Sequence, residues 1–545
     1  MIDFDKQAES HLGVRGLSWQ GPAASIAYEP DDALACLRRL DAPLFVVQNG
    51  RCVGVTNAGE LGPAGNGGLP VVATGDSVTR CFLGDPAFLA TYGLEAAYMG
   101  GSMANGISSE EMVIALGRAG MLGAFGAGGC PPRRLEEAIR RVQAAQGRGT
   151  SQTCPYAFNL IHSPHEPALE RRAVELYLEH GVHVVEASAY LSLTPYLVAY
   201  RAAGLSVDAS GVIQVRNRVI AKLSRREVAT QFLHPAPEKL LGPLVAQGVI
   251  TQQQATLAQR VPMADDITVE ADSGGHTDNR PLVCLLPSMA ALRDEIQAER
   301  QYRVPVRIGA GGGIGTPLSA LGAFMMGAAY VVTGSVNHGC VEAGTSDHVK
   351  RLLAQAGMAD VMMAPAADMF EMGVNVQVLK RGTMFGLRAR KLYEVYQTYD
   401  SLEAIPEAER RKLERQILQS PVEDVWDSCE AFFSERDPAQ IIRAQENPKR
   451  KMALVFRWYL GLATRWGTKG ETGRELDYQI WCGPAMGAFN DWVRGTYLED
   501  PANRSVADVA GQIMDGAAFH YRVQSLRIQG VQLPAALLNW RPLAV

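Results

Sequence analysis

From about residue 95 onward, short apolar runs alternate with longer segments whose apolar residues recur at helical spacing. The segments 108–120 and 132–146 are two such amphipathic stretches. Apolar runs of about four to eight residues separated by helices are typical of βα units and a parallel sheet. The eight predicted strands are 96–101, 121–129, 156–163, 183–189, 218–224, 266–275, 304–313 and 329–336.

Eight strand-helix repeats within about 270 residues match a (β/α)8 TIM barrel in number and size. A doubly wound parallel sheet is the alternative. We therefore expect an α/β fold with a barrel over residues 91–394. A small β-rich domain would precede it in residues 1–90, and an all-helical domain would follow it in residues 395–545.

One interval in the repeat is too long for a simple connection. A polar, glutamine-rich insertion at about 224–262 follows a predicted strand end. It is either a helical lid over the active site or a surface elaboration. The aromatic residues of the C-terminal region are predicted to form a core, with an exposed groove as the alternative.

The stretch RIGAGGGIGTP, residues 307–317, joins a predicted strand to a predicted helix. Its glycines let backbone amides approach an anion, Thr316 can cap the helix, and Pro317 suits the first helical position. Helix N-termini of this kind bind phosphate, although a tight turn without a ligand is the alternative. Strand eight ends in Gly334 and Ser335, and adjacent strand ends of this type form the phosphate site of TIM barrels.

Polar side chains at other strand ends are candidates for chemistry, because barrel enzymes act at the C-terminal ends of their strands. Strand six supplies Glu270, Asp272 and then His276 behind two glycines. His276 is the predicted acid-base group, and Lys222 on strand five is expected to contact a ligand because a lysine in a barrel strand needs a partner. Asn159 on strand three either hydrogen-bonds a heteroaromatic ring or stabilises a turn.

Composition narrows the class of partner. The 545 residues are 47% hydrophobic and 20% charged, with a net charge of −5, so nucleic acid and membranes are not expected partners. Nine scattered cysteines without CxxC pairs fit reduced thiols, and no zinc-type spacing is present, so no metal is expected. An acidic, polar start and the lack of a long apolar run favour a cytoplasmic protein.

A series of motifs runs in order from about residue 95 to near the C-terminus. They are MANGISSEEMVIALGRAGMLGAFGAGG, FNLIHSP, EADSGGHTDNRP, IGAGGGIGTP, VVTGSVN, APAADMFEMGVNVQVLKRGTMF, RWYL and DYQIWCGPAMGAFNDW. With these motifs the chain resembles the PfaD family, the trans-acting enoyl reductases of polyketide and polyunsaturated fatty acid synthases. More distantly, the barrel resembles the nitronate monooxygenases and the flavin-dependent enoyl-acyl-carrier-protein reductases, which are FMN-binding barrels.

The resemblance implies FMN, with its phosphate held by the two glycine-containing strand ends and its ring near strands one, three and five. His276 takes the position of the GGH histidine of the distant relatives. The residues expected to bind the cofactor are Met103, Ala104, Asn159, Lys222, Asp272, Gly275, Gly311, Gly312, Gly313, Gly334 and Ser335. The relatives lack the insertion and the long C-terminus, so catalytic roles transfer less directly than FMN binding.

The expected reaction is NADPH-dependent reduction of an enoyl thioester on an acyl carrier protein domain of a polyketide synthase, with His276 and Lys222 as catalytic residues. A nitronate monooxygenase-like oxidase and a flavin-free docking protein are the alternatives, and a homodimer is one option for the assembly. A basic cluster is either a carrier-protein docking surface or a solvated helix face. It comprises Lys380, Arg381, Arg388, Arg390 and Lys391.

Overall fold

The computed structural model describes residues 17–64, 67–145, 154–164 and 166–544, and the first 16 residues of the expected N-terminal domain lie outside it. Its centre is a closed barrel of parallel strands in the order β12-β13-β15-β16-β6-β7-β8-β9. All eight strands lie within the predicted runs, and closure excludes the doubly wound sheet. The strands are β6 Tyr98–Gly100, β7 Leu122–Phe125, β8 Ala157–Ile161, β9 Val184–Ser188, β12 Arg218–Leu223, β13 Asp266–Glu270, β15 Arg307–Gly311 and β16 Val331–Thr333.

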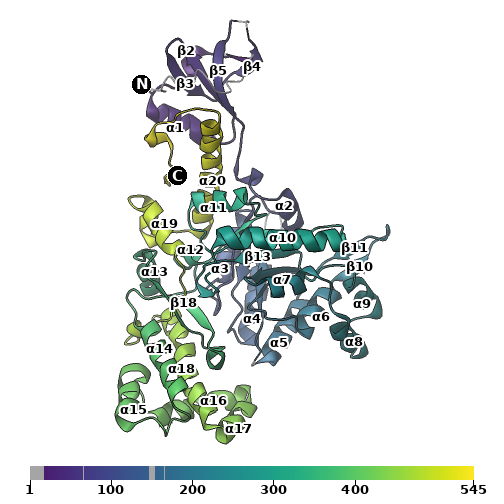
Figure 1. The fold of residues 1–545 in the computed structure, drawn as a ribbon, viewed down its shortest axis with the longest axis vertical. Coiled ribbons are helices and arrows are strands. Elements are labelled where there is room, and N and C mark those ends of the chain that lie inside the picture. Colours follow the sequence, from purple (N-terminus) through teal and green to yellow (C-terminus); the bar gives the residue numbers. More distant parts are fainter. Residues whose placement is uncertain (1–16, 65–66, 146–153, 165, 545) are drawn as a thin grey trace.

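Helices surround the barrel, as expected for strands that are buried on both faces (Figure 1). The eighth helical position is filled from far along the chain: α20, Val506–Ile528, contacts both α11 and α3. The other helices of the ring are α3 Glu110–Arg118, α4 Pro132–Ala144, α5 Pro167–Glu179, α6 Pro195–Ala203, α7 Arg226–Leu233, α10 Leu282–Arg300 and α11 Pro317–Met325.

A separate antiparallel sheet of order β3-β2-β5-β1-β4 forms the N-terminal region, which confirms the small β-rich domain. Arg522 of α20 joins it to the barrel by donating to five backbone carbonyls in residues 37–76. The elements are β1 Leu17–Gln20, α1 Pro30–Arg38, β2 Leu44–Asn49, β3 Cys52–Thr56, β4 Glu60–Pro63 and β5 Leu69–Gly75, followed by α2 Pro86–Tyr92.

The insertion after β12 packs on the outside of the barrel. Its helices α8, Glu238–Ala246, and α9, Gln252–Ala258, contact α6, and α9 also contacts the hairpin of β10, Leu205–Val207, and β11, Ile213–Val215. This placement supports a surface elaboration for α8 and α9, whereas Ser224, Arg225 and Val228 at the start of the insertion line a cavity at the C-terminal end of the barrel.

After β16 the chain forms the short helices α12 Ser335–His338 and α13 Asp347–Ala354, then leaves the barrel and later returns to it. β17, Val361–Pro365, and β18, Asn375–Leu379, form a sheet with β14, Gly275–His276. A helical lobe follows (bottom of Figure 1), comprising α14 Phe385–Thr398, α15 Glu407–Leu413, α16 Val422–Arg436, α17 Pro438–Glu446 and α18 Pro448–Lys469.

Aromatic residues form part of the core of the lobe, as the core interpretation predicts; Phe456 and Tyr459 of α18 are fully enclosed, whereas Phe432 of α16 is 51% exposed. The chain then returns through α19, Ala485–Val493, to α20 beside the barrel. Residues 395–545 are therefore divided between the lobe and the barrel wall.

Candidate functional site

The stretch 307–317 forms the predicted strand, glycine turn and helix start. Thr316 caps α11 by accepting a hydrogen bond from the Ser319 amide, and Pro317 occupies the first turn. Gly312 and Gly313 have φ values of +86° and +74°, which only glycine adopts easily. A Cβ at Gly313 would meet nothing within 4 Å. The turn therefore borders open space at the C-terminal end of the barrel.

That space is a pocket, here called the glycine pocket, between the ends of β6, β12, β13, β15 and β16. It holds about 640 Å³ of empty space, part of it open to solvent. Gly334 also faces open space, because a Cβ there would meet nothing within 4 Å. The predicted site residues that line the pocket are Met103, Lys222, Gly311, Gly312, Gly313, Gly334 and Ser335.

The C-terminal segment closes one side of the glycine pocket, which sequence reasoning did not anticipate. Trp481 and Ala485 line it, and the Gly483 amide donates to Ser335 Oγ at 2.9 Å. A Cβ at Gly315 would lie 2.4 Å from the carbonyl oxygen of Ala485. The motif WCGPAMG was visible in the sequence, but nothing in it indicated contact with a loop more than 160 residues earlier.

Three charged side chains gather at the barrel end beneath the pocket. Lys222 Nζ lies 3.7 Å from Glu270 Oε1, and Glu186 of β9 is fully buried nearby. Burial lowers the pKa of Lys222, but the charges of Glu186 and Glu270 outweigh it and raise that pKa overall. Burial raises the pKa of Glu270, although Lys222 opposes the shift. One cation therefore faces two carboxylates, and the raised pKa of Glu270 favours its protonated form relative to a free glutamate.

Glu186 is a site residue that sequence reasoning missed. Its Oε2 accepts hydrogen bonds from the backbone amide of Ser102, at 2.9 Å, and from the Ser102 hydroxyl. Its Oε1 is buried without a hydrogen-bond partner in the part of the chain that the structure describes. Ser273 Oγ, on the wall of the glycine pocket, is also buried and has no hydrogen-bond partner among the described residues. Unsatisfied buried polar atoms are costly, so this barrel end has capacity for a polar ligand.

His276 lies beside a second cavity and pairs with Asp368. Its Nε2 is 3.2 Å from Asp368 Oδ1, and β14, which carries it, pairs with β18. Burial lowers the pKa of His276, but the Asp368 carboxylate, with help from Glu270, raises that pKa above its usual value. Asp368 stands 92 residues further along the chain, and sequence reasoning did not connect the two.

The loop before His276 is held by Asp272. Asp272 Oδ1 accepts from Asn279 Nδ2 at 2.9 Å and from Gln377 Nε2 at 2.7 Å. Gly275 has a φ of +82°. Neither residue lines the glycine pocket. Both shape the turn that presents His276.

Asn159 and Ala104 also lie outside the lining of the glycine pocket. Asn159 is buried, and its Nδ2 donates to the Glu186 carbonyl and to Ser188 Oγ, each at 3.0 Å. Its amide thus ties β8 to β9. Ala104 lies in the loop after β6 and would be touched by a Cβ at Gly128.

The predicted basic cluster is exposed in part: Lys380, Arg381 and Arg390 lie on the surface, whereas Arg388 does not. Arg388 is largely buried, and the Arg390 Nε donates to the carbonyl oxygen of Met363 at 3.1 Å. Ion pairs join Arg381 to Asp360, Arg388 to buried Asp477 and Lys391 to Glu409. These ion pairs offset part of the positive charge, and the docking surface stays a prediction for the exposed members of the cluster.

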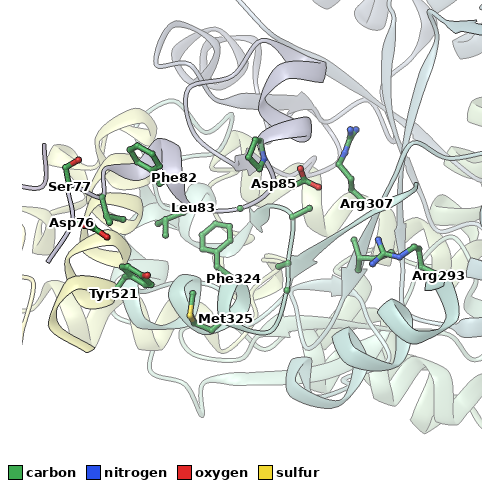
Figure 2. A pocket seen from close by; sticks show the side chains of 17 residues that line it. Asp76, Ser77, Phe82, Leu83, Asp85, Arg293, Arg307, Phe324, Met325 and Tyr521 are labelled. Carbon is green, nitrogen blue, oxygen red and sulfur yellow. The ribbon is translucent and has the colours of Figure 1, made fainter. Parts of the chain in front are cut away.

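A large hollow, here called the basal cavity, lies at the opposite, N-terminal end of the barrel (Figure 2). It holds about 1390 Å³, counting space open to solvent, between linker 76–86, the start of β15 and the end of α11. Figure 2 shows Arg307, Phe324 and Tyr521 around it. Catalytic groups of barrel enzymes sit at the other end, so the basal cavity is not the candidate site.

In the described ranges, neither a metal-binding group of side chains nor a membrane-spanning helix is found. No group of three or more His, Cys, Asp or Glu side chains there is placed to hold a metal ion. Among the described helices, none combines the length and apolar character that crossing a bilayer requires. All nine cysteines are free thiols.

Comparisons with known proteins agree with the motifs. Residues 19–74 match the fatty acid synthase subunit PfaD N-terminal domain family. Residues 399–478 match the inserted helical domain family of acyl-carrier-protein S-malonyltransferase. The second match covers most of the helical lobe.

Two curated relatives are similar over most of the chain. A polyunsaturated fatty acid synthase polypeptide of Thraustochytrium sp. is 49% identical over 93% of this chain, and the polyketide biosynthesis protein PksE of Bacillus subtilis is 46% identical over 82%. The chain spans only 34% and 58% of their respective lengths.

A solved structure covers the same region. The enoyl reductase domain of MlnA, from the macrolactin biosynthesis cluster of Bacillus amyloliquefaciens, is 41% identical with a TM-score of 0.77. The match covers 82% of this chain and 98% of that domain. The chain therefore belongs to the family of PfaD-like enoyl reductases, oxidoreductases built on a TIM barrel.

Proposed function

We propose that the chain is an FMN-dependent enoyl reductase that uses NADPH to reduce the α,β-double bond of enoyl thioesters on an acyl carrier protein. The observation that carries this proposal is the glycine pocket, which opens beside Lys222, Glu270 and His276 at the C-terminal end of the barrel. The names of the relatives support a role in polyketide or polyunsaturated fatty acid synthesis. The lobe's match to an acyl-carrier-protein transferase domain supports a carrier-bound substrate.

The residues of the glycine pocket suit FMN. Gly313 and Gly334 leave room that any Cβ would fill, so backbone amides of both turns can approach a phosphate. Ser273 Oγ offers an unpaired hydroxyl, and Met103 and Trp481 offer apolar surface for a flat ring. FMN held there would supply the hydride-transfer chemistry that links NADPH to the enoyl thioester.

His276 would donate the proton that Cα needs. Its Nε2 is engaged by Asp368, which leaves Nδ1 as the nitrogen that can carry a proton to the substrate. The raised pKa keeps the imidazolium populated at higher pH than for a free histidine. Lys222 would place a positive charge next to the reduced ring, balanced by the two carboxylates.

The test is to time the two half-reactions of His276→Ala separately under anaerobic conditions. We expect NADPH to reduce the flavin at the wild-type rate, while reoxidation by a crotonyl-carrier thioester slows by roughly 10²- to 10⁴-fold. His183→Ala is the control, because His183 lies just before β9 at the opposite end of the barrel and hydrogen-bonds Asn217.

Three outcomes would contradict parts of the proposal. Unchanged turnover of His276→Ala removes its role as the proton donor. Reoxidation of the reduced wild-type protein by a nitronate with oxygen, but not by the enoyl thioester, identifies an oxidase instead. A protein that gains no flavin absorbance when FMN is added is not a flavoenzyme.

A further inference from the structure

A second cavity, here called the mouth cavity, adjoins the glycine pocket. The two share Lys222 and Glu270 in their walls, so they meet at the charged barrel end. The mouth cavity holds about 1210 Å³, counting space open to solvent. It lies between the ends of β9, β12 and β13 and the segment 361–379, here called the strap, which runs from β17 through β18.

The mouth cavity has both polar and apolar walls. Lys222 and Glu270 line it where it meets the glycine pocket, His276 also lines it, and a half-exposed Arg225 in its wall pairs with Asp278 at 3.0 Å. Further polar side chains in the lining are Ser224, Thr277, Asn279 and Asn375. Its apolar surface comes from Tyr190, Leu191 and Val228 on the barrel side and from Met363, Met369 and Met372 on the strap. An apolar ligand with one reactive polar end fits this distribution.

The strap contributes methionines rather than branched or aromatic residues. Met369 is almost fully buried, with 3% of its surface exposed, whereas Met372 is 55% exposed. Met369 therefore forms the inner wall and Met372 the outer edge. Unbranched thioether side chains change rotamer easily and adapt to apolar ligands of different length.

The strap also positions His276. Its strand β18 pairs with β14, which places Val376 opposite His276, and the same segment carries Asp368. The wall of the mouth cavity and the partner of the proton donor thus belong to one hydrogen-bonded unit. A chain lying along the methionines would have its reactive end at His276.

We propose that the mouth cavity binds the acyl chain of the thioester beyond its Cβ, and that Met369 and Met372 determine which chain lengths are accepted. The kinetic part of this inference rests on the proposed function. The binding part does not, because it concerns only an apolar chain and the strap.

The binding experiment uses saturated N-acetylcysteamine thioesters, which cannot be reduced, and isothermal titration calorimetry with the full chain. In the wild type we expect Kd to fall by about fourfold for each methylene buried, from butanoyl towards dodecanoyl, until the cavity is full. Met369→Trp fills the cavity and should weaken dodecanoyl binding at least tenfold while leaving butanoyl binding within about twofold. Met372→Trp, at the exposed edge, is the second variant if the first does not fold.

The matched control is Met325→Trp, because Met325 is 61% exposed and lines the basal cavity at the other end of the barrel. Met325→Trp should change neither the butanoyl Kd nor the dodecanoyl Kd. Equal Kd values for butanoyl and dodecanoyl thioesters in the wild type, or equal weakening of both in Met369→Trp, would overturn the inference.

The kinetic experiment compares kcat/KM for crotonyl and 2-dodecenoyl thioesters. Met369→Trp should lower the dodecenoyl value at least tenfold relative to crotonyl. If no enoyl thioester is reduced by the wild type but the binding pattern holds, the proposed function fails and the acyl site stands. If crotonyl is reduced and the chain-length pattern is absent, the proposed function stands and the acyl site fails.

Discussion

At the N-terminal end of the barrel Arg307 meets Asp266 through two hydrogen bonds of 2.6 and 2.8 Å, whereas at the C-terminal end Lys222 and Glu270 are 3.7 Å apart. The first pair is buried, and Tyr92 and Thr91 supply further hydrogen bonds to it. At the second pair, Glu186 keeps an unpaired oxygen among the described residues.

The difference separates two uses of buried charge. The Arg307–Asp266 pair is closely hydrogen-bonded, so losing one partner would leave an uncompensated charge inside the barrel wall. A loosely packed set of charges with unsatisfied atoms is prepared for a ligand that the protein alone does not provide. The cavities differ in the same direction, since the turns at Gly313 and Gly334, which follow strands β15 and β16, open into the pocket at the C-terminal end.

The largest expected effect is on stability at the basal end. Asp266→Ala leaves the Arg307 guanidinium buried without its carboxylate, which should lower the free energy of unfolding by about 3–5 kcal/mol. The change in unfolding free energy is measured by urea denaturation monitored by circular dichroism.

Lys222→Met is the corresponding substitution in the charge pair at the C-terminal end of the barrel, to be compared with Asp266→Ala. Because burial already raises the pKa of Glu270, that carboxyl can take up a proton when Lys222 is lost. The loss of unfolding free energy should therefore be clearly smaller than for Asp266→Ala. An equal or larger loss would show that the charges at both ends serve stability alone.

The next effect concerns two glycines at the two ends of α11. Gly313 precedes the helix and Gly327 follows it; both have positive φ, and a Cβ at either would meet nothing within 4 Å. Alanine at each should cost a similar backbone strain of roughly 1 kcal/mol. Only Gly313→Ala should weaken FMN binding, by at least about tenfold, as measured by flavin fluorescence titration.

Gly327→Ala serves as the control, since Gly327 lines the basal cavity. Equal loss of FMN in both variants would mean that strain in α11, and not the phosphate turn, sets the affinity.

The smallest expected effect is a shift in pH dependence. Asp368 helps raise the pKa of His276 above 6.5, so protonated His276 and the stability of the pair are present at low pH and are lost as pH rises through the raised pKa. In Asp368→Asn that pKa should fall, moving the alkaline limb of the enoyl reduction profile to lower pH.

Asp360→Asn is the control for Asp368→Asn, because it makes the same chemical change just before the strap. Asp360 precedes β17 and pairs with Arg381 rather than with a histidine. Its profile should match the wild type. If Asp368→Asn leaves the alkaline limb in place, another group supplies the proton.

Much of the barrel could be predicted because parallel strands covered by helices are apolar on both faces, so each strand appears in the sequence as a short continuous apolar run. The glycine turn at 309–315 was equally readable, because a positive φ and a close backbone approach both demand glycine. The site was predicted less completely. Met103, Lys222 and the two glycine turns line one pocket, while Asn159 and Asp272 make contacts within the fold.

What the sequence by itself determined was local: the strand runs, the glycine turns, the helix cap at Thr316 and the family motifs. Only the tertiary structure decided which distant segments meet. Nothing local distinguishes α20 as the eighth barrel helix, Asp368 as the partner of His276, or Asp477 as the partner of Arg388. An amphipathic face or a charged side chain specifies the kind of partner it needs, and the packing of the whole chain selects which one it receives.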